Sequence, residues 1–226
     1  MNDRARVLVV DDERQILRAL KVILREAGYE AIEAATVEEA LDRASVRPPD
    51  AAIIDLMLPD GSGVELCRRL REWSTMPILV LSAIGEEDAK VEALEAGADD
   101  YVTKPFGPRE LVARLGAALR RAGDAPGEPA IEIDGLEVDL NARVVRRDGE
   151  EVHLTPIEFD LLRTLVRHRG RLMTHRALLV EVWGPQYADD TQVLRAHIAN
   201  LRRKIEPSGE RRYIRTDPGV GYRFAG

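Results

Sequence analysis

The run Ala51-Ala52-Ile53-Ile54 leads directly into Asp55, and turn-forming residues follow as far as Gly61. A short, wholly apolar run bounded by turn signals is typical of a strand buried on both faces, as in a parallel sheet. Open α/β sheets bind ligands outside the carboxyl ends of their strands, so Asp55 is expected to face a binding crevice. Taken alone, an aspartate at this place is more often an ordinary loop residue.

Four other apolar runs repeat this pattern and alternate with segments of helical periodicity. Strands are expected at residues 6–10, around 31–32, at 51–55, 77–81 and 101–103, and a helix should follow each one, the last over about 108–121. Such alternation predicts an α/β fold with a parallel sheet covered by helices on both faces.

Polar side chains follow four of these strands. Asp11 and Asp12 come after the first, Asp55 ends the third, and Ser82 and Lys104 follow the fourth and fifth. Because the carboxyl ends of parallel strands lie at one edge of a sheet, these side chains should converge. Converging carboxylates stay ionised only if a cation compensates them, and all-oxygen ligands suit Mg²⁺. A cation beside a carboxylate, with a lysine and a hydroxyl, favours phosphoryl transfer to that carboxylate.

Each of these residues also has an ordinary explanation. Asp11 and Asp12 could open a helix, since acids favour its first turn. Lys104 could be a surface lysine, and Ser82 could cap a strand end. Together these explanations require four coincidences at one sheet edge, so the shared site is the stronger interpretation.

Charge is distributed unevenly along the chain. The 226 residues carry a net charge of -7, with 23 acidic and 17 basic side chains in residues 1–121 but 8 acidic and 13 basic in residues 155–226. The basic second part is the candidate for binding nucleic acid. One cysteine excludes an intramolecular disulfide, and no apolar run approaches the roughly 20 residues of a membrane span. We therefore expect a cytoplasmic protein without a membrane partner or signal peptide.

A Gly- and Pro-rich stretch at 123–129 indicates a linker between domains at 1–122 and 130–226. The second domain should begin with short strands and the hairpin turn Asp148-Gly149. A capping box at Thr155 and a cap at Thr174 should start two helices, the second ending near Trp183. The expected strands lie at residues 131–133, 136–139, 143–147 and 152–154.

A third helix is expected from about 190 to 205, followed by a hairpin around Pro218-Gly219. One narrow stripe is apolar, and the opposite face carries small, amide and basic side chains. Such a face suits a helix in the major groove of DNA, although an ordinary helix with a solvated basic face explains the charges equally well. The face carries Gln192, Ala196, Ala199, Asn200 and Arg203, flanked by Arg195, Arg202, His197 and Lys204.

The set Asp11-Asp12, Asp55, Ser82 and Lys104-Pro105 resembles the receiver domain of two-component response regulators over residues 6–121. The resemblance implies a flavodoxin-like sheet of order 2-1-3-4-5, in which Asp55 accepts a phosphoryl group from a sensor histidine kinase. It implies Mg²⁺ on Asp11, Asp12, Asp55 and the Met57 carbonyl, and a cis Lys104-Pro105 bond. Ser82, Lys104 and Tyr101 would sense the phosphoryl group, although Tyr101 could simply pack on the preceding helix.

Residues 153–159, 182–184, 201–204 and 219–224 resemble the winged-helix effector of the OmpR/PhoB class. The resemblance implies that Asn200 reads a base, and an asparagine can pair with adenine. Pro218 stands where some members carry an arginine that enters the minor groove, which puts minor-groove reading in doubt. The DNA-binding residues expected from the resemblance and from the helix face are Arg176, Trp183, Gln192, Arg195, His197, Asn200, Arg202, Arg203 and Tyr222.

The same resemblance implies a homodimer formed on phosphorylation, with promoter DNA and RNA polymerase as further partners. Across a two-fold axis, the pairs would be Lys90 with Glu110, Asp100 with Arg114, and Asp99 with Arg121. Intrachain or unpaired surface charges are the alternative. Within the subfamily, residues 58–61, 70–74 and 99–107 resemble KdpE-type regulators of potassium uptake.

Two other functions are alternatives to this one. A phosphatase of the haloacid dehalogenase type would need an Asp-x-Asp motif after the first strand, whereas Asp11 and Asp12 are adjacent. We therefore do not expect an enzyme. A DNA-binding protein with a silent receiver is disfavoured by the complete acidic set.

Met57 and Ile84 lie two residues after Asp55 and Ser82, where their bulk should hinder attacking water and slow self-dephosphorylation.

Overall fold

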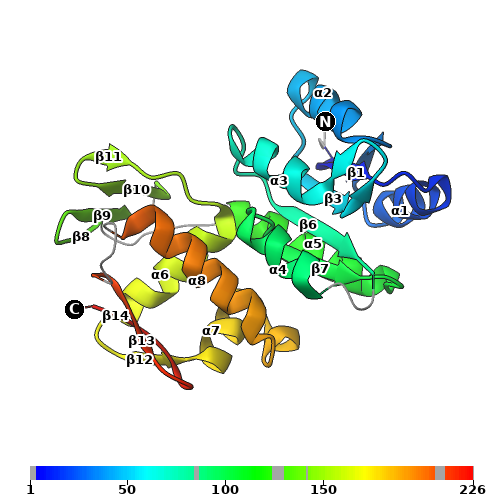
Figure 1. Cartoon of the computed structure of the whole chain (residues 1–226). Helices are drawn as coiled ribbons and strands as arrows, with labels where there is room; N and C mark the ends of the chain where they lie inside the picture. The colour runs from blue at the N-terminus through cyan, green and yellow to red at the C-terminus, as the bar shows by residue number, and fades with distance from the viewer. Residues whose placement is uncertain (1–3, 84–86, 124–129, 141, 207–211, 226) are drawn as a thin grey trace. The chain divides into compact units, whose positions relative to one another are not determined.

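A computed structural model describes residues 4–83, 87–123, 130–140, 142–206 and 212–225. The chain divides into two compact units, Met1–Ala122 and Gly123–Gly226, which are described separately (Figure 1). No helix in these described ranges has the length and hydropathy of a membrane span.

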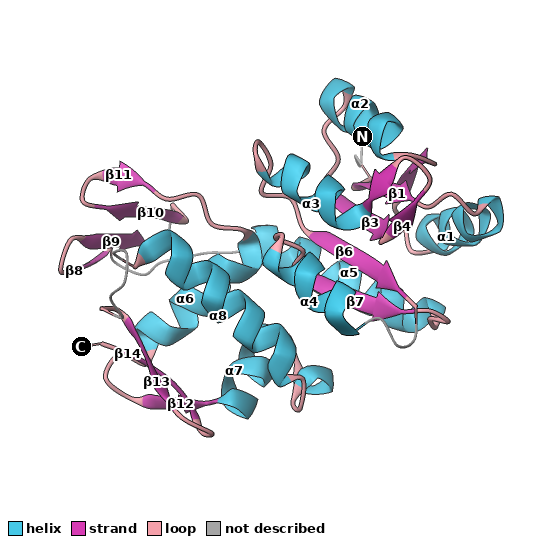
Figure 2. Cartoon of the chain, viewed as in Figure 1, coloured by secondary structure: helices cyan, strands magenta, loops and turns pink. Residues whose placement is uncertain are grey.

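The first unit is built on a five-stranded parallel sheet of order β2-β1-β3-β6-β7, drawn in magenta in Figure 2. In order of appearance along the chain these strands are numbers one to five, so the expected order 2-1-3-4-5 is confirmed. Central strands β3 and β6 are buried at every residue, as their apolar runs predict. The bounds are β1 (Arg6–Val10), β2 (Glu30–Ala34), β3 (Ala51–Asp55), β6 (Ile78–Ser82) and β7 (Asp100–Thr103).

Five helices alternate with these strands, as expected. Leu17, Leu20 and Leu24 of one helix and Leu111 and Leu115 of another pack on the same face of the sheet. Of the other three helices, the second contacts the third, and the third contacts the fourth. This arrangement leaves the carboxyl ends of the strands free to carry the site. The bounds are α1 (Arg14–Glu26), α2 (Val37–Val46), α3 (Gly63–Arg71), α4 (Glu87–Glu95) and α5 (Pro108–Gly123).

A small hairpin between β3 and α3 was not expected from the sequence. It consists of β4 (Met57–Leu58) and β5 (Gly61–Ser62), which pair antiparallel. The Gly63 N–H donates to the Leu56 carbonyl over 2.9 Å and closes the base of the hairpin. The Ser62 hydroxyl accepts from the Val64 N–H and caps α3.

The second unit begins with an antiparallel sheet of order β11-β10-β9-β8. Asp148 and Gly149 form its two-residue turn, with φ angles of 53° and 87°, as the Asp-Gly pair predicts. The strand expected at 152–154 is wrong. The last strand of the sheet ends at Glu151, and after one further hydrogen bond, from the Val152 N–H to the Val145 carbonyl, the chain runs on to the helix that begins at Pro156. The bounds are β8 (Ile131–Ile133), β9 (Leu136–Asp139), β10 (Val144–Arg147) and β11 (Glu150–Glu151).

Three helices and a second antiparallel sheet of order β12-β14-β13 complete a winged-helix unit, confirming the fold class. Thr155 and Glu158 form the predicted capping box, and Thr174 caps the second helix. Strand β12 was not foreseen. The bounds are α6 (Pro156–Arg167), β12 (Leu172–Thr174), α7 (His175–Val182), a 3₁₀ turn η1 (Pro185–Tyr187), α8 (Thr191–Ile205), β13 (Ile214–Asp217) and β14 (Gly221–Phe224).

Candidate functional site

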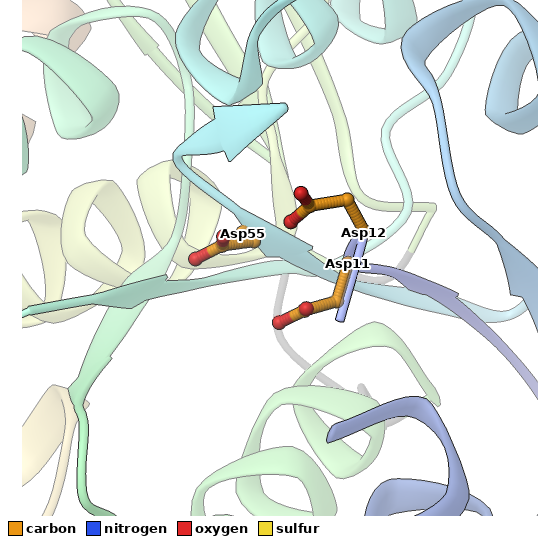
Figure 3. A group of neighbouring side chains, drawn as sticks. All are labelled: Asp11, Asp12 and Asp55. Carbon is orange, nitrogen blue, oxygen red and sulfur yellow. The ribbon is translucent and has the colours of Figure 1, made fainter. Parts of the chain in front are cut away.

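The three carboxylates predicted to converge do so at the end of β1 and β3 (Figure 3). Ligand oxygens of Asp11, Asp12 and Asp55 all lie within 4.8 Å of one another. Asp11 is fully buried, Asp55 is nearly so, and Asp12 is exposed. The backbone of Asp11 is fixed by a hydrogen bond, in which its N–H donates to the Ala34 carbonyl over 3.2 Å. The Asp11 carboxylate accepts from the Glu13 N–H over 2.8 Å.

Lys104 lies among these carboxylates. Its Nζ is 2.9 Å from Oδ2 of Asp11 and 2.9 Å from Oδ1 of Asp55. Burial raises the pKa of Asp55, and the nearby Lys104 offsets that rise only in part. Burial alone would lower the pKa of Lys104, but its bonds to Asp11 and Asp55 outweigh this and raise it. One ammonium thus faces three carboxylates, and an oxygen-only set with excess negative charge fits a hard cation such as Mg²⁺.

Ser82 supplies a hydroxyl at the same edge. It is the last residue of β6, and Leu81 is in register with Asp55 of β3. The side chain is fully buried, yet its Oγ has no hydrogen-bond partner among the residues that the structure describes. The Lys104 N–H donates to the Ser82 carbonyl over 2.7 Å, which places these two residues side by side. A buried hydroxyl without a partner is costly, and a phosphoryl oxygen on Asp55 would satisfy it.

The Lys104-Pro105 bond is cis, as predicted. Tyr101 is half-buried on β7, and Nζ of Lys90 lies 5.1 Å from the centroid of its ring. That contact agrees with the plainer interpretation, in which Tyr101 packs against α4, while its role as a switch stays a prediction. Met57 is 70% exposed beside the site. Ile84, its predicted companion, lies outside the described residues.

Four of the six charges assigned to a dimer face form ion pairs within one chain, in the part of it that the structure describes. Nη1 of Arg114 lies 3.2 Å from Oδ2 of Asp100, and Nη2 of Arg114 lies 2.9 Å from Oε1 of Glu110. Asp99 is buried and paired with Arg71 over 2.7 Å, an intrachain contact that the sequence did not suggest. The side chain of Arg121 lies outside the described residues. Pairing across a two-fold axis therefore stays a prediction.

Helix α8 buries its predicted apolar stripe of Leu194, Ile198, Leu201 and Ile205. The exposed residues of the helix are Gln192, Arg195, Ala199 and Arg203, with Thr191, Arg202 and Lys204 half-exposed. Ala196, His197 and Asn200 were assigned to the opposite, open side of the helix but are buried. A base contact by Asn200 stays a prediction, and it requires this side chain to become accessible.

Other predicted DNA contacts have partners inside the second unit. The His197 ring lies 5.4 Å from the Trp183 ring, between centroids. Nη2 of Arg202 donates to the Ile214 carbonyl over 2.7 Å and to the Thr216 hydroxyl over 2.8 Å, and the guanidinium lies over the Tyr222 ring. Arg202 therefore joins α8 to the wing. Arg176 is exposed and pairs with Asp189 over 3.0 Å.

Sequence reasoning missed the contact of Asp60. Its carboxylate accepts hydrogen bonds from the N–H groups of Val37 and Glu38, at the start of α2. Val37 and Glu38 lie 23 and 22 positions before Asp60 in the chain, so no local sequence pattern predicts these hydrogen bonds.

Comparison with known proteins agrees with this architecture. Residues 7–116 match the response regulator receiver domain family, and residues 149–224 match the family "Transcriptional regulatory protein, C terminal". The chain is 51% identical over 221 residues to the transcriptional regulatory protein KdpE of Mycobacterium tuberculosis H37Rv, covering 96% of this chain and 98% of that protein. It is 49% identical over 222 residues to the KDP operon transcriptional regulatory protein KdpE of Escherichia coli K12, with the same coverage.

Among solved structures, a mutant of RitR superposes with a TM-score of 0.77 at 27% identity, covering 98% of this chain and all of that one. The response regulator DrrB of Thermotoga maritima, described as an OmpR/PhoB homologue, is 31% identical over 99% of this chain with a TM-score of 0.53. The receiver pocket, the winged helix and these relatives lead to one conclusion: the chain is a two-component response regulator of the OmpR/PhoB winged-helix subfamily, similar to KdpE over nearly its whole length.

Proposed function

We propose that this regulator is switched on when a sensor histidine kinase phosphorylates Asp55, and that the phosphorylated form binds promoter DNA as a homodimer. The proposal rests on the convergence of three carboxylates, a lysine and a buried serine hydroxyl at one sheet edge, where that hydroxyl has no partner among the described residues. Such a set has the parts that phosphoryl transfer to a carboxylate needs.

The chemistry follows from the positions of these side chains. A carboxylate oxygen of Asp55 forms a bond to phosphorus while the bond from phosphorus to the histidine nitrogen of the kinase breaks, and that nitrogen keeps the electron pair. Lys104, which now contacts Asp55, is placed to pair with a phosphoryl oxygen. The Ser82 hydroxyl can donate to another oxygen of the same group.

Magnesium is the proposed cofactor. Asp11, Asp12, Asp55 and the Met57 carbonyl would hold the ion, which supplies neutralising charge to the transferring oxygens when bound. Asp11 is already fixed by its bonds to Ala34 and Glu13, so this ligand needs little rearrangement.

The output of the site is DNA binding. The exposed row of α8, with Gln192, Arg195 and Arg203, offers an amide and two cations to a DNA groove. Arg202 holds the wing on this helix through Thr216 and Ile214, so the helix and wing would meet DNA as one body. The similarity to KdpE suggests a potassium-uptake operon as a target.

Two experiments test this proposal. In cells, chromatin immunoprecipitation of the wild type should enrich DNA upstream of a potassium-transport operon, and Asp55→Ala should lose that enrichment. Equal enrichment for both proteins would contradict phosphorylation control.

Dimerisation is tested in solution by sedimentation with and without beryllofluoride, which mimics the phosphoryl group. The wild type should shift to a dimer. Glu110→Lys should not, because a lysine there repels the predicted partner Lys90. Glu110 is about half-exposed, so this substitution spares the core. A dimer that forms equally without beryllofluoride and in Glu110→Lys would rule out this surface as the phosphorylation-dependent dimer interface.

A further inference from the structure

The hairpin of β4 and β5 carries the Met57 carbonyl, one of the four ligands proposed for magnesium. At its base, the Gly63 N–H donates to the Leu56 carbonyl, and Met57 pairs with Ser62. Each of its two strands is only two residues long. An isolated two-stranded hairpin is marginally stable at best, so backbone pairing alone should hold this one poorly.

The tip of the hairpin is tied to α2 by one side chain. Asp60 Oδ1 accepts from the Val37 N–H over 2.9 Å, and Oδ2 accepts from the Glu38 N–H over 3.1 Å. Gly61 lies against the same helix, since an added Cβ there would come within 3.3 Å of the Val37 side chain. The hydrogen bond from Val37 lowers the pKa of Asp60, so the carboxylate is charged at neutral pH.

Asp60 differs from an ordinary helix cap, because it accepts hydrogen bonds from the start of α2 in addition to the residue that caps this helix. The first N–H groups of a helix lack partners within it. Here the N–H of Glu39 is taken by the Thr36 hydroxyl over 3.1 Å, in the usual way for the residue preceding a helix. The N–H groups of Val37 and Glu38 are taken by Asp60, a residue of the hairpin.

The start of α2 is also close in the chain to the acidic ligands of β1. Helix α2 begins three residues after Ala34, whose carbonyl accepts from the Asp11 N–H. A path therefore runs from the hairpin through the hydrogen bond of Asp60 to Val37, along the polypeptide to Ala34, and through the Ala34 carbonyl to Asp11. It would connect the hairpin, which carries the Met57 carbonyl proposed as a ligand, to Asp11 and Asp12.

We propose that Asp60 is a positioning residue of the phosphorylation site, whose carboxylate fixes the Met57 carbonyl relative to Asp11 and Asp12. The inference rests on the magnesium site of the proposed function. Asp60 itself does not touch the metal or the phosphoryl group. Its removal takes away both of these hydrogen bonds between the hairpin and α2.

The test measures magnesium affinity by isothermal titration calorimetry on the full chain. Asp60→Ala should raise the dissociation constant for Mg²⁺ about 10-fold, the lower end of the effect of residues that orient metal ligands. Asp60→Asn keeps one oxygen acceptor and should have a smaller effect. At saturating Mg²⁺, the rate of phosphorylation by acetyl phosphate should return towards the wild-type value for both variants.

Thr36→Ala is the matched control, because it removes a bond from the same helix end without touching the hairpin. Circular dichroism should show folded protein for each variant, and Asp60→Asn replaces Asp60→Ala if the latter does not fold. Weakened Mg²⁺ binding in the Asp60 variants with unchanged binding in Thr36→Ala supports the proposal. Wild-type affinity in the Asp60 variants, or equal weakening in Thr36→Ala, overturns it. A wild type that binds no Mg²⁺ would instead refute the proposed function.

Discussion

Gly63 is the residue at which a single methyl group should do the most damage to the phosphorylation site. It is the first residue of α3, and its backbone passes directly over the end of β3. A Cβ added at Gly63 would lie 2.1 Å from the Asp55 carbonyl oxygen and 2.9 Å from Cα of Leu56. An ordinary contact begins at 3.4 Å, so the methyl group and the oxygen would have to separate by 1.3 Å.

Both neighbours are backbone atoms, so no side-chain rotation can make room. Inserting a methyl group into a packed interior costs about 1–3 kcal/mol, and this position belongs at the upper end because main chain must move. A loss of about 3 kcal/mol changes the unfolding equilibrium roughly 100-fold. The displaced atoms belong to Asp55 itself, so phosphorylation by acetyl phosphate should also fall.

Gly107→Ala is the control, since a Cβ there meets no heavy atom within 4 Å. Urea unfolding can be followed at Trp73, the single tryptophan of residues 1–122, if Trp183→Phe is introduced into every protein compared. Gly63→Ala should unfold at a clearly lower urea concentration than Gly107→Ala. Equal urea midpoints for the two variants would show that the start of α3 does not approach the Asp55 carbonyl closely enough to exclude a methyl group.

Three further outcomes are expected. Magnesium at 100 times its dissociation constant should stabilise the wild type by about 2.7 kcal/mol in thermal unfolding, and Asp55→Asn should lose most of this gain; equal gains would place the ion elsewhere. A hydrogen bond from the Ala35 N–H, and then one from Arg43, lowers the pKa of Glu39. The stability that the Glu39 carboxylate contributes is therefore present above its unfolded pKa and is lost as pH falls through its folded pKa. Glu39→Gln should lower the free energy of unfolding at pH 7 but change it little near pH 3, and an equal loss at both pH values would contradict this. Met57→Asn should shorten the lifetime of the phosphorylated form, measured with purified protein and Mg²⁺, and an unchanged lifetime of seconds would refute shielding by Met57.

The parts of the fold that follow from local pattern could be predicted from the sequence. The short apolar runs ending in Asp55 and Ser82 are strands buried at every residue, which is the pattern of a parallel sheet covered on both faces. The capping box of Thr155 and the turn at Asp148-Gly149 were predictable because each depends on residues within a few positions. Convergence of the site followed from topology, since parallel strands end at one edge.

Contacts between distant residues could not be predicted in this way. The ties of Asp60 to α2 and of Asp99 to Arg71 join residues more than 20 positions apart, and both become visible only once the elements are packed. A helical wheel likewise assigned His197 and Asn200 to the open side of α8, because it takes no account of what packs beside a helix. The Trp183 ring against His197 is one such neighbour.

In the proposed function a single aspartate, Asp55, receives the phosphoryl group. Intact-protein mass spectrometry after incubation with acetyl phosphate and Mg²⁺ tests it most directly. The wild type should gain the mass of a single phosphoryl group, and Asp55→Asn should gain none. A wild type of unchanged mass, or the same gain in Asp55→Asn, would contradict it.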